Sequence, residues 1–264
     1  MENDIKNLPV VRLTENGKGD RNDLVAREFP LTIILNNQEL VTLLCSPSNL
    51  KYLALGFLSS EGLIKNRDEI SKVMVDEKRG VVRVETKKDK DFDHELVFKR
   101  FITSGCGRGA SFYNAADVRE GSAVTSQTNI SSREIFSLMK DFQHHSQIFR
   151  ATGGVHGAAL CDNVNILIFA DDIGRHNAID KIFGRCFLED SIIDNCLIIT
   201  SGRISSEVLL KVAKRNIPIL ISKSAPTDLG VKLANDLGIT LIGFVRAKRM
   251  NIYTNDWRVI NNEP

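Results

Sequence analysis

Hydrophobic and polar positions follow two different patterns along the chain, and the change falls near residue 131. In the first part, short β-branched and apolar runs flank turn residues such as Asn36-Asn37, which is typical of hairpins. One segment, 50–58, instead repeats apolar residues at helical spacing, with Ser48 or Asn49 placed to cap it. These patterns predict a small α+β unit. Its expected strands are 31–35, 40–44, 73–75, 81–84 and 95–101.

From residue 131 onward, predicted helices and strands alternate. Ser131 and Glu134 form a capping-box signature, and Ser205 and Thr227 are expected to cap two later helices. Alternation of this kind predicts a three-layer α/β domain whose sheet is at least partly parallel. The expected strands are 158–160, 164–169, 197–200, 217–222, 240–244 and 251–253, and the later helices are 175–188, 206–215 and 227–237.

The length of 264 residues and the hydrophobic content of 42% allow two modest cores. The first residues are polar and are interpreted as a tail. The predicted organisation is a tail at 1–23, a small α+β domain at 24–104, a reactive-cysteine loop and linker at 105–130, and an α/β domain at 131–264.

The overall charge excludes some classes of partner. A net charge of +2 with 26% charged residues gives no reason to expect binding to nucleic acid or to a membrane surface. The N-terminus lacks the apolar core of a signal peptide, and no apolar run is long enough to span a bilayer. We therefore expect a cytoplasmic protein.

Five scattered cysteines form neither a disulfide framework nor a zinc pattern, so a reducing compartment is expected. Four of them lie in apolar runs and are predicted to be core residues: Cys45, Cys161, Cys186 and Cys196.

Cys106 differs from these four. It lies between Gly105 and Gly107 and is followed by Arg108. Glycines allow an accessible turn, and a neighbouring cation favours the thiolate over the thiol. An isolated cysteine is more often a small buried hydrophobe, but this surrounding sequence favours a reactive sulfur.

Four polar or glycine-rich loops of the second half follow or precede predicted strands. Loop 152–157 contains His156, and its histidine has about even odds of being merely structural. Segment 171–181 follows a strand and opens a helix, so its amides can meet an anion. Segments 201–205 and 244–249, each taken alone, are more simply a strand-to-helix connection and a solvated turn. Because these loops adjoin the ends of strands in one proposed sheet, we expect several of them to meet at one site at the strand ends.

Together, several of these motifs resemble those of the FdhD family of formate dehydrogenase accessory sulfurtransferases. The resemblance covers about residues 24–253 and implies a cytidine-deaminase-like C-terminal fold, a smaller N-terminal α+β domain and a homodimer. The motifs that carry it are Leu53-Ala54-Leu55-Gly56-Phe57-Leu58, Ser60-Glu61-Gly62, Thr152-Gly153-Gly154-Val155-His156, Asp172-Ile173-Gly174-Arg175-His176-Asn177-Ala178-Ile179-Asp180-Lys181, Ser201-Gly202-Arg203, Ser224-Ala225-Pro226-Thr227 and Phe244-Val245-Arg246.

The resemblance also implies a chemistry. A cysteine desulfurase transfers sulfane sulfur to the family member as a persulfide, and the sulfur then passes to the molybdenum or tungsten bis(molybdopterin guanine dinucleotide) cofactor of formate dehydrogenase. Cys106 matches the persulfide-carrying cysteine, and no protein-ligated metal is implied. The expected partners are the desulfurase, the formate dehydrogenase apo-enzyme and the guanine nucleotide portion of the cofactor. The residues expected to bind the cofactor are Phe244, Val245, Arg246, Ala247, Lys248 and Arg249, together with Arg175, His176 and Arg203.

The chain differs from many family members at one position, and two other functions are compared with sulfur transfer. Many family members have a second cysteine where this chain has Gly109, so an intramolecular dithiol step is in doubt. A zinc deaminase is rejected, because Gly157 and Ala158 follow His156 where the proton-shuttling glutamate is needed, and no paired cysteines complete a metal site. A cofactor-binding chaperone in which Cys106 is incidental stays open.

Overall fold

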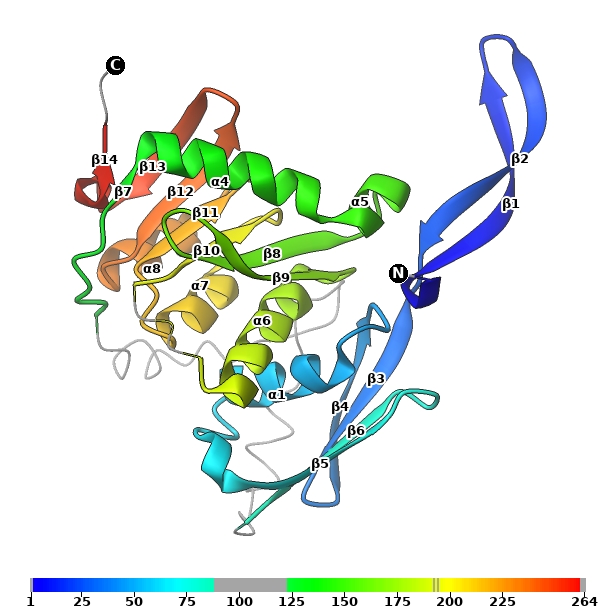
Figure 1. The fold of residues 1–264 in the computed structure, drawn as a ribbon, viewed down its shortest axis with the longest axis horizontal. Helices are drawn as coiled ribbons and strands as arrows, with labels where there is room; N and C mark the ends of the chain where they lie inside the picture. The colour runs from blue at the N-terminus through cyan, green and yellow to red at the C-terminus, as the bar shows by residue number, and fades with distance from the viewer. Residues whose placement is uncertain (1, 88–122, 192, 194, 262–264) are drawn as a thin grey trace.

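The computed structural model describes residues 2–87, 123–191, 193 and 195–261 (Figure 1). Cys106, most of the predicted 105–130 linker and the strand expected at 95–101 lie outside these residues. The described chain forms a mixed α/β structure in which an N-terminal hairpin, a four-stranded sheet and a six-stranded sheet follow one another.

The four-stranded sheet carries the N-terminal core. Its strand order is β4-β3-β6-β5, with β3 and β6 parallel and the other neighbours antiparallel. Alternate residues of β3, namely Leu31, Ile33 and Leu35, are fully buried in a cluster that includes the apolar side chains of α1. Both hairpins expected from the sequence are confirmed. The elements are β3 (Phe29–Leu35), β4 (Gln38–Cys45), α1 (Leu50–Ser60), η2 (Arg67–Glu69), β5 (Ile70–Asp76) and β6 (Val81–Thr86).

The interpretation of residues 1–23 as a polar tail is wrong, because most of them form a hairpin arm. After η1 (Glu2–Asp4), strands β1 (Ile5–Thr14) and β2 (Gly17–Ala26) pair antiparallel over their whole length. The arm projects from the body of the molecule, and its base contacts α5 (Figure 1). The overlooked signal is Asn16-Gly17, a dipeptide common in tight hairpin turns, with Gly17 at φ 123°. Backbone pairing therefore orders this segment despite its polar composition.

The six-stranded sheet has the order β13-β12-β11-β10-β8-β9. Strands β10, β11 and β12 are parallel, as the alternating pattern predicted, and the remaining pairs are antiparallel. The strands are β8 (His156–Cys161), β9 (Ile166–Asp172), β10 (Leu197–Thr200), β11 (Ile219–Ser222), β12 (Thr240–Arg246) and β13 (Arg249–Thr254). The helices are α4 (Ser132–His145), α5 (Gln147–Thr152), α6 (Arg175–Glu189), α7 (Ser206–Ala213) and α8 (Asp228–Asp236). A short parallel pair, β7 (Ile130–Ser131) and β14 (Val259–Ile260), and η3 (Asp256–Arg258) complete the described fold.

Apolar clusters lie on both faces of this sheet. On one face, Ile199 and Ile221 pack with the buried side of α4; on the other, Ile198 and Leu220 pack with α6, α7 and α8. Because alternate strand residues point to opposite faces, a sheet covered on both faces has nearly continuous apolar strands. All four residues of β10 are accordingly buried. The cytidine-deaminase-like arrangement stays a prediction.

The helix caps agree only in part with the sequence. The capping box of α4 is confirmed, since Glu134 N–H donates to Ser131 Oγ and Ser131 N–H donates to Glu134 Oε2. Thr227 caps α8 by accepting from Gly230 N–H. Ser205 precedes α7 but makes no side-chain cap bond, and neither does Asn49 before α1. The four cysteines predicted to be core residues are buried as expected.

Helices α1 and α6 join the two parts of the molecule through close backbone contact at two glycines. A Cβ atom on Gly56 would lie 1.8 Å from the carbonyl oxygen of Asp180, and one on Gly184 would lie 1.8 Å from that of Tyr52. No side chain fits at either position unless the helices separate. This crossing fixes the small domain against the helix that begins beside the strand ends.

We expect Gly184→Ala to lower the free energy of unfolding by about 3 kcal/mol or more, the upper range for overpacking, because its new methyl group meets rigid backbone. Urea denaturation followed by circular dichroism measures the change. Gly19→Ala in the exposed arm is the matched control, since no atom lies within 4 Å of its added Cβ. Equal midpoints for the two variants would contradict the close helix contact.

Candidate functional site

Strand pairing brings most of the predicted loops to one edge of the six-stranded sheet. Thr200 at the end of β10 pairs with Ser222 at the end of β11 and with Ala158 in β8. At the same edge, His156 at the start of β8 pairs with Asp172 at the end of β9. The loops that follow β9, β10, β11 and β12 and the loop that precedes β8 therefore open on one edge, which we call the strand-end site.

A buried ion pair fixes the segment between β9 and α6. Lys181 Nζ lies 2.7 Å from Asp172 Oδ2, and both side chains are almost wholly buried. Asp172 also accepts hydrogen bonds from Ser46 N–H, from Gly174 N–H and from the Asn177 side chain. The backbone that places Arg175 and His176 at the start of α6 is thus held by buried charge and by Ser46 of the N-terminal domain.

His156 and the loop after β10 contact each other at this edge. His156 Nδ1 lies 3.2 Å from Ser201 Oγ, which also accepts from Gly157 N–H. Burial, and secondarily the charge of Arg175, lower the pKa of His156. The next residue, Gly202, packs directly against the Arg175 side chain, because an added Cβ would lie 2.8 Å from Arg175 Cβ. His156 is therefore a neutral hydrogen-bonding group near the positive charge of Arg175.

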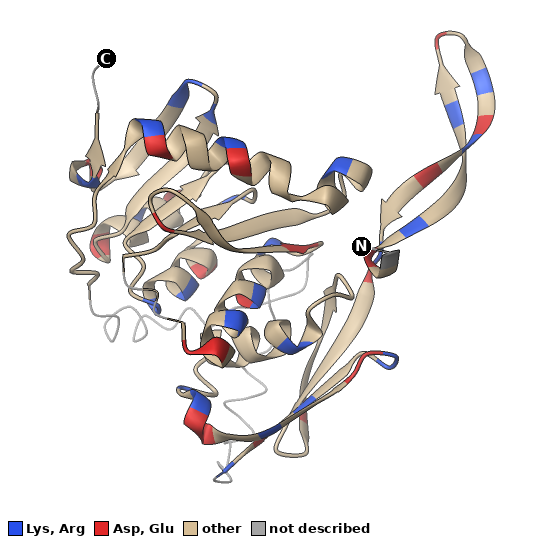
Figure 2. Cartoon of the chain, viewed as in Figure 1, with Lys and Arg blue, Asp and Glu red and all other residues tan. Residues whose placement is uncertain are grey.

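The turn from β12 to β13 carries further cations, which Figure 2 shows as blue segments. Arg246 donates to the carbonyl oxygens of Lys223 (2.5 Å) and Val245 (3.0 Å), so it ties this turn to the loop after β11. Phe244 is 41% exposed and adopts φ 53°, whereas Val245 is fully buried in the core. The side chain of Val245 thus contributes packing, and the polar contacts of this segment come from its neighbours. The remaining residues of the turn, Ala247, Lys248 and Arg249, are exposed.

Two further residues reach the strand-end site and were not singled out by the sequence analysis. Lys223 follows β11 and lies next to Arg246 through its carbonyl oxygen. Glu207, in the first turn of α7, places Oε2 3.2 Å from His176 Nε2. The sequence could have pointed to Lys223, because this residue directly follows a predicted strand as the other loop cations do. Nothing in the sequence pointed to Glu207, because its partner His176 is distant in sequence.

His176 is neutral at physiological pH. Burial is the main cause that lowers its pKa to about 3, and the positive charges of Lys211, Arg175 and Arg203 and the neighbouring His156 lower it further. These effects also show that Arg175 lies near both histidines and that Arg203 lies near His176, which fits the predicted meeting of these loops. His176 and His156 can exchange hydrogen bonds with a ligand here, but neither adds a positive charge.

The strand-end site is rich in hydrogen-bond donors of positive charge. Guanidinium and ammonium groups donate only, and Arg matches the geometry of phosphate oxygens. The site is therefore suited to an anion with several oxygens, such as a pyrophosphate. Its cationic residues are Arg175, Arg203, Lys223, Arg246, Lys248 and Arg249. In the part of the chain that the structure describes, no group of His, Cys, Asp and Glu is arranged to hold a metal ion.

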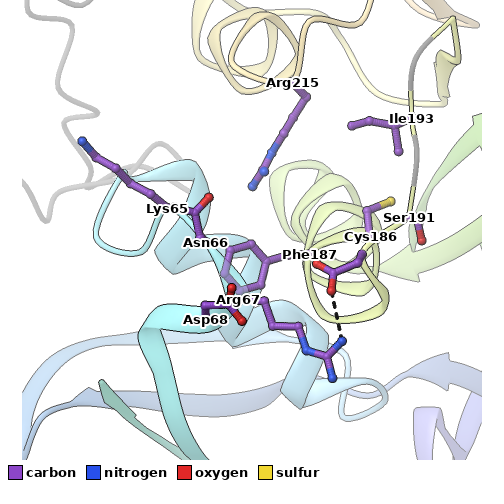
Figure 3. A pocket seen from close by; sticks show the side chains of 10 residues that line it. Lys65, Asn66, Arg67, Asp68, Cys186, Phe187, Ser191, Ile193 and Arg215 are labelled. Carbon is purple, nitrogen blue, oxygen red and sulfur yellow. Dashed lines mark hydrogen bonds and ion pairs between the residues drawn. The ribbon is translucent and has the colours of Figure 1, made fainter. Parts of the chain in front are cut away.

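A separate cavity of about 400 Å³ lies at the opposite end of α6 (Figure 3). It is lined by Cys186 and by charged residues, among them Arg215 and the ion pair of Arg67 with Asp190 (3.2 Å). Burial raises the pKa of the Cys186 thiol to about 11, so the thiolate is scarce there. This cavity does not supply the reactive sulfur that the sequence analysis expects.

The structure thus places Arg175, His176 and Arg203 together, with the predicted 244–249 segment along the same edge. Cys106, the predicted sulfur carrier, lies outside the described residues. No helix among the described residues is long and apolar enough to cross a membrane.

Comparison with known proteins agrees with this arrangement of motifs. Residues 26–260 match the model of the FdhD/NarQ family. The chain is 47% identical to the sulfur carrier protein FdhD of Bacillus pumilus (strain SAFR-032), covering 90% of this chain and 91% of that protein. It is 48% identical to the protein of that name in Bacillus subtilis (strain 168), covering 90% of each. A crystal structure described as that of a formate dehydrogenase accessory protein from Desulfotalea psychrophila superposes with a TM-score of 0.79 at 27% identity, covering 97% of this chain and 99% of that chain. The chain belongs to the FdhD/NarQ family.

Proposed function

We propose that this protein is a cytoplasmic sulfur carrier that serves the maturation of formate dehydrogenase. It accepts sulfane sulfur from a cysteine desulfurase as a persulfide on Cys106 and transfers it to the molybdenum or tungsten bis(molybdopterin guanine dinucleotide) cofactor. Family membership and the names of its relatives support the sulfur-carrier role. The proposal includes the homodimer and the cytidine-deaminase-like C-terminal architecture that the resemblance implies.

The sulfur relay balances without an added oxidant. Cys106 thiolate attacks the outer sulfur of the donor persulfide, so one S–S bond forms as another breaks and the donor leaves as a thiolate. In the second step the outer sulfur leaves Cys106 and both electrons of the S–S bond stay on the thiolate. The acceptor supplies the electron pair for its new bond to sulfur. These two steps need only one thiol in the chain, which agrees with Gly109 at the second cysteine position.

The observation that carries the proposed cofactor binding is the convergence of cations at the strand-end site. The cofactor is a substrate that carries pyrophosphate groups, and these fit a donor set of Arg and Lys side chains. Arg203 and Arg249 are exposed and belong to separate loops of the same edge. Both side chains can therefore contact a pyrophosphate, and replacing either one is not expected to disturb the fold.

We expect Arg203→Ala to weaken the binding of guanosine diphosphate, used as a surrogate for one nucleotide arm, by about tenfold, the effect of one charge-assisted hydrogen bond. Isothermal titration calorimetry at fixed ionic strength measures it. Arg79→Ala removes an exposed cation from the β5–β6 turn and should leave the affinity unchanged. If Arg203→Ala and Arg249→Ala both bind the nucleotide as tightly as the wild type, the strand-end site is not the binding site.

A further inference from the structure

His176 and Glu207 form a close pair at the strand-end site. His176 Nε2 lies 3.2 Å from Glu207 Oε2, and the two side chains are 15% and 20% exposed. They come from the first turns of α6 and α7, the helices that follow β9 and β10. The pair is therefore partly open to the edge on which the predicted loops converge.

A second pair joins the same two helices one turn deeper. Asp180 and Lys211 each lie four residues after a member of the first pair, and Lys211 Nζ contacts Asp180 Oδ2 at 2.5 Å. Ser60 Oγ donates to the other carboxylate oxygen of Asp180. Asp180 in this inner pair is buried, Lys211 is 12% exposed, and the two charges already satisfy each other. It fixes the spacing of α6 and α7, and with it the distance between His176 and Glu207.

The outer pair is not an ion pair, because His176 is neutral. Its pKa is lowered to about 3 by burial and by its cationic neighbours, which are Lys211 on α7, Arg175 on its own helix and Arg203 after β10, with His156 on β8. Glu207 is the acidic group that faces it. A neutral imidazole carries one proton, on either of its two nitrogens.

The carboxylate of Glu207 favours one of the two neutral tautomers of His176. If Nε2 were unprotonated, its lone pair would face a carboxylate oxygen 3.2 Å away. With the proton on Nε2, the same contact becomes attractive. Nε2 makes no hydrogen bond in the present arrangement, so the two side chains must reorient to complete one. The Nε2–H tautomer leaves the lone pair on Nδ1.

We propose that Glu207 is a positioning residue: it holds His176 with Nε2–H toward its carboxylate, so that Nδ1 accepts a hydrogen bond from the nucleoside part of the bound cofactor. This inference rests on the proposed function. The cations around the pair can only donate, which suits phosphate oxygens but leaves an N–H or O–H of a base or ribose without a partner. A fixed neutral acceptor meets that need and adds no charge that would repel the phosphates.

Binding measurements with two probes separate this role from a general effect on charge or folding. We expect Glu207→Ala and His176→Gln to weaken guanosine diphosphate binding by about tenfold, the value of one hydrogen bond in a site that requires it. Inorganic pyrophosphate, which lacks the nucleoside, should bind each variant within about twofold of the wild type. His176→Asn, whose side-chain oxygen can lie near the position of Nδ1, should retain more nucleotide affinity than His176→Gln.

The outcomes distinguish this inference from the proposed function. Equal losses for both probes, or unchanged nucleotide binding by Glu207→Ala and His176→Gln, would overturn the role of the pair while leaving cofactor binding intact. A wild-type protein that binds neither probe would overturn the proposed cofactor binding and this inference with it.

The tautomer is directly measurable by ¹H–¹⁵N correlation spectroscopy of histidine-labelled protein, with His176 assigned from the His176→Asn variant. We expect the Nε2–H form with no titration between about pH 5 and pH 8, since the pKa lies well below this interval. In Glu207→Gln the amide can donate or accept, so a mixture of tautomers is expected. An Nδ1–H form in the wild type, or titration near pH 6.5, would contradict the proposal.

Discussion

Replacing Cys106 by alanine is expected to abolish both sulfur loading and the activation of formate dehydrogenase. The thiolate is the attacking group in the proposed relay, and alanine has no sulfur to accept the outer atom. After incubation with a cysteine desulfurase and cysteine, intact mass spectrometry should show a gain of about 32 Da, one sulfur atom, in the wild type only. The gain should disappear on reduction.

Cys186→Ala is the matched control for this loss. Cys186 is buried, and its raised pKa keeps it protonated near neutral pH, so its removal should leave the mass gain in place. Cys45 is a second control, because burial and Asp172 raise its pKa to about 12. A mass gain that persists in Cys106→Ala would assign the carrier role to another thiol. If the mass gain is lost but most formate dehydrogenase activation survives, the protein is a cofactor-binding chaperone.

The second large effect is expected for Lys181→Met, which should lower the free energy of unfolding by about 3–5 kcal/mol. Methionine fills similar space but leaves the Asp172 carboxylate buried without its cation. Three hydrogen bonds to Asp172 remain, yet they do not neutralise its charge. Because these bonds join Ser46 to the start of α6, nucleotide binding at the strand-end site should weaken as well. Chemical denaturation and calorimetry measure the two effects.

The double variant Asp172→Asn/Lys181→Met tests the cause of that loss. It removes both charges, so it should recover part of the stability that Lys181→Met loses. Lys140→Met on the exposed side of α4 controls for the loss of a lysine and should change the unfolding free energy by less than about 0.5 kcal/mol. A double variant less stable than Lys181→Met would mean that the unpaired carboxylate is not the source of the destabilisation.

The sequence by itself determined the elements whose causes are local. The capping box at Ser131 and Glu134, the hairpin of β3 and β4 and the alternation of helices and strands after residue 131 depend on neighbours a few residues apart, and each was predicted. The motif around 172–181 identified the family for the same reason, since its residues are consecutive. Asn16-Gly17 also carried a local signal for the N-terminal arm, but the polar composition around it concealed the hairpin.

Only the tertiary structure decided which side chains share a site. Loops near residues 156, 175, 203 and 246 are far apart in sequence. They meet because antiparallel pairing of β8 with β9 and β10, and parallel pairing of β10, β11 and β12, bring these strand ends to one edge. Residues of the predicted 244–249 segment have different roles in the structure. Val245 is buried in the core, whereas Arg246 donates a hydrogen bond that joins two loops. The pairing of Glu207 with His176, and the pKa that keeps this histidine neutral, come from the packing of α6 against α7. Local patterns record backbone preferences, whereas proximity and desolvation depend on how distant segments pack, and a single sequence does not contain those distances.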